Sequence, residues 1–169
     1  MSVDAPTFKA ALSRFASGVT VVTVADAEGP VGMTASAFTS LSLDPPLVLV
    51  CVAKKARFHA RLLGAAGFGV SLLDASQKAL SNAFAGWGPD AAAPWAIAPS
   101  QPGAHSGAPL LDGALAVLDC TRVAVHDGGD HSIVVGRVEA ATLGAPAAAD
   151  LHPLLYFAGK YRHLGEALD

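Results

Sequence analysis

The feature that most constrains the fold is a pair of long strand-like runs joined by a tight turn in the second half of the chain. Residues 114–126 and 131–143 are rich in apolar and β-branched residues, and Asp127-Gly128-Gly129-Asp130 connects them. Such a turn is typical of a β-hairpin, because glycine readily adopts the positive φ that tight hairpin turns require. We therefore expect an antiparallel sheet with two long neighbouring strands.

Four further runs predict strands of the same sheet, at residues 19–25, 31–42, 47–53 and 68–73, the second with a bend between Ala37 and Ser40. The first two should form a hairpin across DAEGP, and the continuous apolar run LVLVCVA predicts a strand buried on both sides. Helices are expected at residues 7–17, 56–63 and 74–85, with Thr7 as the first N-cap and Asp74 and Gln77 forming a capping box on the third. At least six strands and three singly inserted helices favour a mainly β antiparallel barrel with peripheral helices over a doubly wound α/β fold.

Composition limits the functional classes. A chain of 169 residues with 52% hydrophobic and 15% charged residues suits a single domain over residues 1–169, and a net charge of -3 argues against nucleic acid as a partner. No run resembles a membrane span or a signal peptide, so we expect a cytoplasmic protein. Cys51 and Cys120 lie in apolar runs and are predicted to be buried free thiols, and no residue spacing indicates a metal site. The low charge favours a homo-oligomer.

A candidate ligand site begins in the run GMTASAFTSLS, residues 32–42. Hydroxyl side chains alternate there with alanines, so a bound molecule could approach the backbone closely and find hydrogen-bond partners. The alternative is a Thr/Ser-rich edge strand that faces water.

A second candidate follows the run 47–53, where Lys54, Lys55 and Arg57 precede the predicted helix 56–63. Cations beside a helix N-terminus favour a phosphate group, although a solvated turn would have the same composition. Neither GxGxxG nor GxxxxGK[ST] is present, so a nucleotide would have to be held in another way.

Several segments, in order, resemble the flavin reductase family with the FMN-binding split-barrel fold: GMTASAFTSLSLDPPLVLVCV, FGVSLLDASQKALSNAFAG, GAPLLDGALAVLDC, GGDHSIVVGRVEA and PLLYFAGKYRHL. The chain is similar to the small reductase component of two-component flavin-dependent monooxygenases. The resemblance implies a six-stranded antiparallel Greek-key barrel, a homodimer, and hydride transfer from NADH or NADPH to FMN or FAD. It also implies a separate oxygenase that receives the reduced flavin.

The resemblance further implies roles for individual residues. The positions matching the isoalloxazine and ribityl contacts are Thr34, Ala35, Ser36, Ala37 and Ser40. The positions matching the phosphate or pyrophosphate contacts are Val52, Ala53, Lys54, Lys55, Arg57 and Phe58. Phe84 matches a position beside the cofactor, and His131 and Tyr161 match positions near the nicotinamide, with His131 as the candidate catalytic hydrogen-bond donor. Ser71 departs from the family pattern, in which asparagine is common.

Two alternatives fit the same residues. One is a split-barrel enzyme that keeps FMN permanently and acts on a small organic substrate. The other is a non-catalytic flavin- or haem-binding module, for which His126, His152 or His163 could supply an iron ligand.

Overall fold

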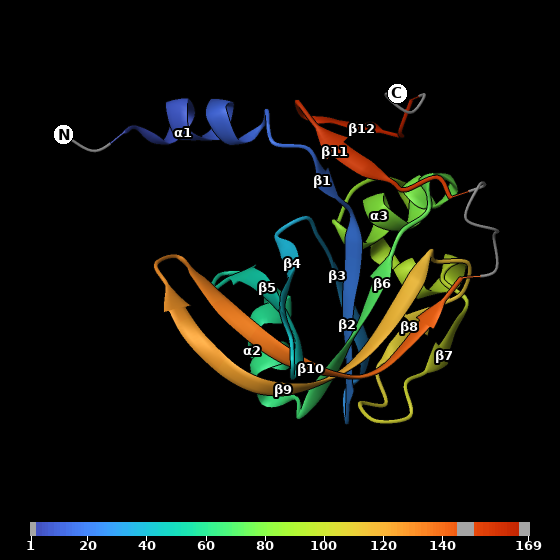
Figure 1. Cartoon of the computed structure of the whole chain (residues 1–169). Helices are drawn as coiled ribbons and strands as arrows, with labels where there is room; N and C mark the ends of the chain where they lie inside the picture. The colour runs from blue at the N-terminus through green and yellow to red at the C-terminus, as the bar shows by residue number, and fades with distance from the viewer. Residues whose placement is uncertain (1–2, 145–150, 166–169) are drawn as a thin grey trace.

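The computed structural model describes residues 3–144 and 151–165 and is built around one antiparallel sheet of seven strands (Figure 1). The strand order is β3-β2-β6-β9-β10-β5-β4. The bounds of these strands are β2 Thr20–Asp26, β3 Gly29–Ala35, β4 Phe38–Leu43, β5 Pro46–Ala53, β6 Gly67–Leu72, β9 Ala116–Gly128 and β10 His131–Leu143. The mainly β antiparallel fold that the sequence predicts is confirmed.

Smaller elements surround this sheet. The strands β1 (Ser17–Gly18), β11 (Leu155–Phe157) and β12 (Lys160–Arg162) form a three-stranded sheet, and β7 (Ser100–Pro102) pairs with β8 (Pro109–Leu111). The α-helices are α1 (Ala5–Leu12), α2 (Arg57–Gly64) and α3 (Lys78–Phe84), and 3-10 helices span Ala75–Gln77, Pro89–Ala92 and Pro94–Ile97. Within residues 3–144 and 151–165, no helix has the length and apolar character needed to cross a membrane.

The main sheet curls strongly, so that its two edge strands come together. β3 ends at Ala35 and β4 begins at Phe38, so two residues connect opposite edges of the sheet, and no ladder joins β3 to β4 in this described part of the chain. The long strands β9 and β10 bend around the sheet in Figure 1, helped by register shifts next to Gly136 and Val138, since bulges increase local bending and twist. The run 31–42, for which the sequence predicts a bend between Ala37 and Ser40, is thus divided into two strands just before that point, and the sheet has seven strands where at least six are expected.

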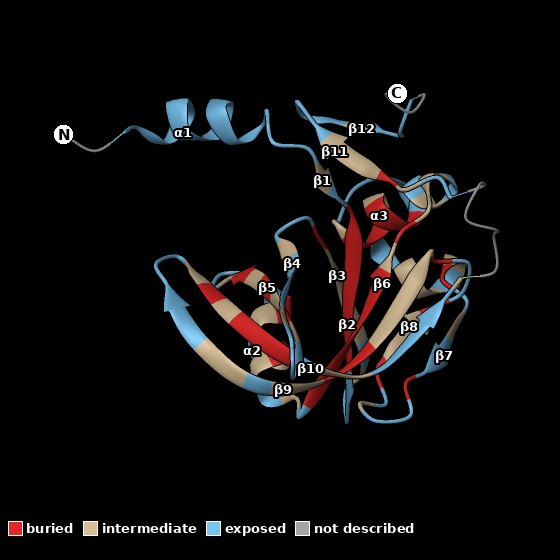
Figure 2. Cartoon of the chain, in the orientation of Figure 1, coloured by how far each residue is buried: buried red, intermediate tan, exposed pale blue. Residues whose placement is uncertain are grey.

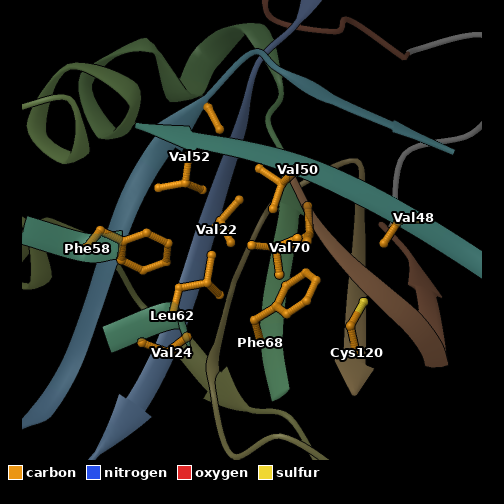
Figure 3. Close-up of a cluster of buried hydrophobic side chains, with 12 residues drawn as sticks. Val22, Val24, Val48, Val50, Val52, Phe58, Leu62, Phe68, Val70 and Cys120 are labelled. Carbon is orange, nitrogen blue, oxygen red and sulfur yellow. The ribbon is translucent and has the colours of Figure 1, made fainter. Parts of the chain in front are cut away.

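The main core fills the inside of the curled sheet. Figure 3 shows valines of β2, β5 and β6 meeting the side chains of Phe58 and Leu62 from α2, together with Phe68 and Cys120. Phe58 is 3% exposed and Leu62 is fully buried. Each such side chain contributes about 1.5–3 kcal/mol through burial. α2 is therefore anchored in the core by one face, which fixes the position of its N-terminus.

A second core cluster places α3 against the sheet. Leu80 and Phe84 of α3 pack with Val21, Leu73 and Leu111, as the helical spacing predicts. The predicted capping box is confirmed at the start of this segment, where the Asp74 carboxylate accepts from the Ser76 amide and the Gln77 side chain accepts from the Asp74 amide.

The first helix differs from the prediction in two ways. Its N-cap is Asp4, whose carboxylate accepts a hydrogen bond of 2.8 Å from the Thr7 amide, so Thr7 lies inside the helix. The predicted packing is also wrong, because α1 buries none of its residues against this chain and leaves Phe8 and Leu12 exposed (Figure 2). The apolar face of α1 is present, but it has no cover within the described chain.

The strand β5 also departs from the prediction of burial on both sides. Its residues alternate between buried and half-buried, with Val48, Val50 and Val52 inside and Leu49 and Cys51 on the other face. The outer face of β5 is also apolar, but its side chains are only half-buried. Both cysteines are free, as predicted, but only Cys120 is buried.

Candidate functional site

A cavity of about 450 Å³ lies where β3, α3 and the β11–β12 hairpin converge. This volume falls within the ~300–1,000 Å³ typical of small-molecule sites. Its wall is mostly apolar, with hydroxyl groups from β3, α3, β11 and β12 and from Ser36. The residues that line it are Val19, Met33, Thr34, Ser36, Ala56, Ser81, Phe84, Ala85, Trp87, Tyr156 and Tyr161.

The hydroxyl groups form a network that ties β3, α3 and β12 together. Thr34 Oγ1 donates to the carbonyl oxygen of Ser81 at 2.7 Å, and Ser81 Oγ is 2.9 Å from the Tyr161 hydroxyl. Ser81 is fully buried, whereas Thr34 and Tyr161 are half-buried and reach the cavity. Ser81 therefore binds Thr34 through its backbone carbonyl and Tyr161 through its hydroxyl, and holds both side chains around the same space.

An aromatic wall closes the side of the cavity next to α3. Phe84 is 6% exposed and meets the indole of Trp95 edge-on, with ring centroids 4.9 Å apart. The Trp95 indole donates in turn to the carbonyl oxygen of Pro30 at 3.1 Å. Gly32 allows the Phe84 ring to lie directly against β3, because a Cβ at position 32 would come within 2.9 Å of that ring.

The predicted cations gather beside this cavity, at the connection from β5 to α2. Ala56 lines the cavity and is also the N-cap of α2, with no side-chain cap on the helix amides. Lys54 forms an ion pair with Asp127, and this hydrogen bond holds the pKa of the Asp127 carboxyl below its usual value. Within the described residues, Lys55 and Arg57 have no ion-pair partner, so their charges remain available next to the open helix N-terminus.

His131 lies at the start of β10, opposite Ala53 of β5. Its Nδ1 is 2.7 Å from Asp130 Oδ1, and this hydrogen bond lowers the pKa of the Asp130 carboxyl, with a smaller contribution from Lys55. The amide of Lys54 donates to the Asp130 carbonyl at 2.9 Å. His131 therefore belongs to the cation-rich end of β5 and is absent from the lining of the 450 Å³ cavity.

A second cavity, of about 690 Å³, lies on the outer face of the sheet against α1. Leu12 and Phe15 line it on one side, and Leu49 and Cys51 on the other. Its lining includes Phe38 and the 73%-exposed Phe15, but it lacks Phe84, Tyr161 and the α2 N-cap residue Ala56, which line the first cavity. We therefore treat the cavity at β3 and α3 as the candidate active site.

Comparisons with known proteins agree with this fold. The family model described as flavin reductase like domain matches residues 12–165 of this chain. The reductase component of 4-hydroxyphenylacetate 3-monooxygenase from Thermus thermophilus is 46% identical over 157 residues, which cover 93% of this chain and 95% of that protein. An NADH-dependent flavin reductase from a Rhodococcus species is 43% identical over 162 residues, covering 91% of this chain and 83% of that protein.

The chain belongs to the flavin reductase family. Among solved structures, the NADH:FAD oxidoreductase of Streptomyces globisporus in complex with NAD and FAD fragments superimposes on this flavin reductase with a TM-score of 0.86, at 37% identity and with both chains fully covered.

The flavin reductase structure separates the predicted site residues into groups. Thr34, Ser36, Phe84 and Tyr161 line the candidate active site. Ala53, Lys54, Lys55, Arg57 and His131 lie together at the end of β5 and the start of α2 and β10. Ser36 also borders the second cavity, which Ala37 lines as well.

Four predicted residues lie away from the cavity lining. Ala35, Val52 and Phe58 point into the main core, where they are at most 6% exposed. Ser40 is exposed on β4, opposite Val48. Any contact from these positions of the flavin reductase to a ligand would have to come from the backbone or, for Ser40, from the surface of the sheet.

Sequence reasoning missed Ser81 and Trp87. Ser81 is one helical turn before Phe84, so the same spacing that put Phe84 on the inner face of α3 could have identified it.

Ser71, where the family pattern commonly has asparagine, has a structural role. Its side chain is fully buried, and its hydroxyl accepts a hydrogen bond from the Leu111 amide at 3.0 Å. Within the described residues, no group of three or more His, Cys, Asp or Glu side chains is placed to bind a metal ion.

Proposed function

We propose that this flavin reductase transfers hydride from NADH to FMN or FAD and supplies the reduced flavin to a separate monooxygenase. The observation that carries the proposal is the cavity at β3 and α3, where an apolar aromatic wall, a fixed set of hydroxyls and two unpaired cations at a helix N-terminus adjoin one another. Its relatives named for NADH dependence and for a monooxygenase reductase component support the choice of donor and partner.

The chain contributes position and exclusion of water more than acid or base catalysis. A flavin accepts hydride when the nicotinamide ring stacks on it at close range in a dry site. Phe84 and Met33 supply the apolar surface for such stacked rings, and the Thr34 and Tyr161 hydroxyls supply the polar contacts at their edges. Because Ser81 fixes both hydroxyls, they are already oriented before a ligand arrives.

The phosphate of the flavin is proposed to bind at the first turn of α2. This helix offers amides without a side-chain cap, and Lys55 and Arg57 flank its N-terminus. Helix dipole and side-chain charges act in the same direction there, which favours an anion. The flavin would then run from the helix N-terminus, past Ala56, into the cavity.

His131 is proposed as a hydrogen-bond donor to the dinucleotide. Its position beside Lys55 suits the phosphate-bearing part of a ligand better than the ring that reacts, since His131 lies outside the cavity lining. We expect His131→Ala to lower turnover while the protein remains folded. Unchanged steady-state kinetics would exclude this role.

The functional unit is proposed to be a homodimer. Phe8, Leu12 and Phe15 expose 55%, 51% and 73% of their surface, and two of them border the apolar cavity against Leu49. Water-exposed apolar surface of this extent favours burial against a second copy. We expect Leu12→Glu to shift the protein toward monomer in light scattering, whereas Leu143→Glu, which changes another exposed leucine, should not. We further propose that residues 1–169 form a single domain and that the protein is cytoplasmic.

The test of the proposed function is NADH and NADPH oxidation by dialysed protein with FMN, FAD, riboflavin or no flavin. We expect turnover that requires added flavin. In the double variant Lys55→Ala and Arg57→Ala the KM for FMN should rise about 10- to 100-fold, from the loss of charge-assisted hydrogen bonds, while the KM for riboflavin should not change because riboflavin has no phosphate.

Arg137→Ala, which removes a positive charge elsewhere on β10, is the matched control and should behave as the wild type. Absence of flavin-dependent oxidation with every pair of substrates would overturn the proposed function. Protein that stays yellow after dialysis would instead favour an enzyme that keeps FMN permanently bound.

A further inference from the structure

Trp87 is the side chain of the cavity wall that the proposed chemistry does not use. It lines the cavity with Phe84 and Tyr161, yet 57% of its surface is exposed. Trp95, the other tryptophan of the chain, is packed against Phe84 and hydrogen-bonded to Pro30. Across residues 3–144 and 151–165, no side-chain hydrogen bond holds the Trp87 indole. Because Trp87 both lines the cavity and is largely exposed, we describe its position as the mouth of the cavity.

The backbone places Trp87 at this mouth by its conformation. α3 ends at Phe84, and the next two glycines, Gly86 and Gly88, have φ values of +81° and +83°. A Cβ on either glycine would meet nothing within 4 Å, so glycine is needed there for the turn and not for space. The Trp87 amide donates to the Asn82 carbonyl at 2.8 Å, which ties the turn back to the helix.

The burial of the surrounding groups indicates which ring of a dinucleotide can stack on the Trp87 indole. Ser81 is fully buried in the cavity lining, and the Thr34 and Tyr161 side chains that it contacts are half-buried, whereas Trp87 is 57% exposed. Reacting rings belong at that depth, because hydride transfer is favoured where water is excluded. The rim is left for the part of a dinucleotide that does not react.

We propose that Trp87 stacks on the adenine ring of a dinucleotide whose reacting ring lies deeper in the cavity. The inference rests on the proposed function for the identity of the ligand class. Adenine is a planar π system, and base–aromatic stacking is worth about 1–3 kcal/mol per base by alanine substitution, equivalent to about 5- to 150-fold in affinity. Both FAD and NADH carry adenine, and FMN does not.

The first measurement is tryptophan fluorescence with ADP, which contains adenine without a flavin or nicotinamide. Trp95→Phe leaves Trp87 as the sole emitter, and Trp87→Phe leaves Trp95. We expect ADP to quench the first variant in a saturable way and to leave the second unchanged. This readout does not depend on turnover, so it can succeed even if flavin-dependent NADH oxidation is absent.

The second measurement separates the two sources of adenine by use of Trp87→Ala. If FAD supplies the ring, its Kd rises about 5- to 150-fold while the Kd for FMN stays within twofold. If NADH supplies it, the KM for NADH rises by a similar factor with FMN as acceptor, while the KM for reduced nicotinamide mononucleotide does not. Equal changes for FMN and FAD, or no change for FAD and NADH alike, would overturn the inference. Thermal unfolding of Trp87→Ala should match the wild type, because the side chain is exposed.

Discussion

The contact between Gly32 and Phe84 controls the shape of the candidate active site, and Gly32→Ala tests it. The added Cβ would lie 2.9 Å from Cδ1 and Cε1 of Phe84 and 3.3 Å from Cγ2 of Thr23. Carbon atoms pack at about 3.5–4.0 Å, so the Phe84 ring has to move by about 0.6 Å or more. Thr23 cannot make room, because it is fully buried and its hydroxyl donates to the Pro109 carbonyl at 2.6 Å.

The ring borders open space on its cavity side. Trp95 packs on it at a centroid distance of 4.9 Å, so we expect the ring to move away from Trp95 and into the cavity that it lines. Overpacking of this kind costs about 1–3 kcal/mol, which for a chain of this size lowers the Tm by about 2–12 °C. The same displacement narrows the space for the stacked rings, and we expect the Kd for flavin to rise about tenfold, equivalent to ~1.4 kcal/mol.

The assay is thermal unfolding by circular dichroism together with flavin titration, at equal protein concentration for all variants. Gly64→Ala is the matched control, because a Cβ there meets nothing within 4 Å and Gly64 is not among the glycines with positive φ. In the Phe84→Leu background, Gly32→Ala should lower the stability much less than in the wild type, since the phenyl ring that clashes with the added Cβ is gone. An equal loss of stability in both backgrounds would refute the reasoning, as would wild-type stability and flavin affinity in Gly32→Ala.

Two further predictions concern titratable groups. Hydrogen bonds from Arg61 hold the pKa of the Asp26 carboxyl below its usual value, so this pair stabilises the fold above the unfolded pKa of about 3.9 and the contribution is lost as the pH falls through the folded pKa. Asp26→Asn should therefore lower the Tm at pH 7 and converge with the wild type as the pH falls through the folded pKa of Asp26, and a constant difference at all pH values would contradict the prediction. Burial raises the pKa of the Cys120 thiol to about 12, so at pH 8 a thiol reagent should modify Cys120 only after unfolding, and modification of both Cys120 and Cys51 in the native protein would count against it.

Short-range sequence patterns were sufficient to predict many of the structural elements. The turn at Gly128 and Gly129, the capping box at Asp74 and the helix that follows Lys54 and Lys55 all depend on residues within a few positions of one another. Backbone conformation and short-range hydrogen bonds decide such features, so they can be inferred without knowledge of the rest of the chain.

The predictions that failed depend on contacts between distant parts of the chain, which no short-range sequence pattern contains. For the run 31–42 the sequence predicts only a bend, between Ala37 and Ser40, but closure of the curled sheet ends β3 at Ala35 and begins β4 at Phe38. The apolar spacing of Phe8 and Leu12 predicted an amphipathic helix correctly and its packing incorrectly, because the spacing does not say what covers the face.

By itself, the sequence determined the mainly β antiparallel class, most element positions and, through its resemblance to flavin reductases, the kind of ligand to expect. The tertiary structure decided which of the candidate residues share a cavity. Thr34, Ser81 and Tyr161 are 47 and 80 residues apart along the chain, and they meet only because β3, α3 and β12 pack together. Phe58 and Val52 turned inward for the same reason: the side of each element that faces the core is set by burial across the whole fold, which local sequence cannot specify.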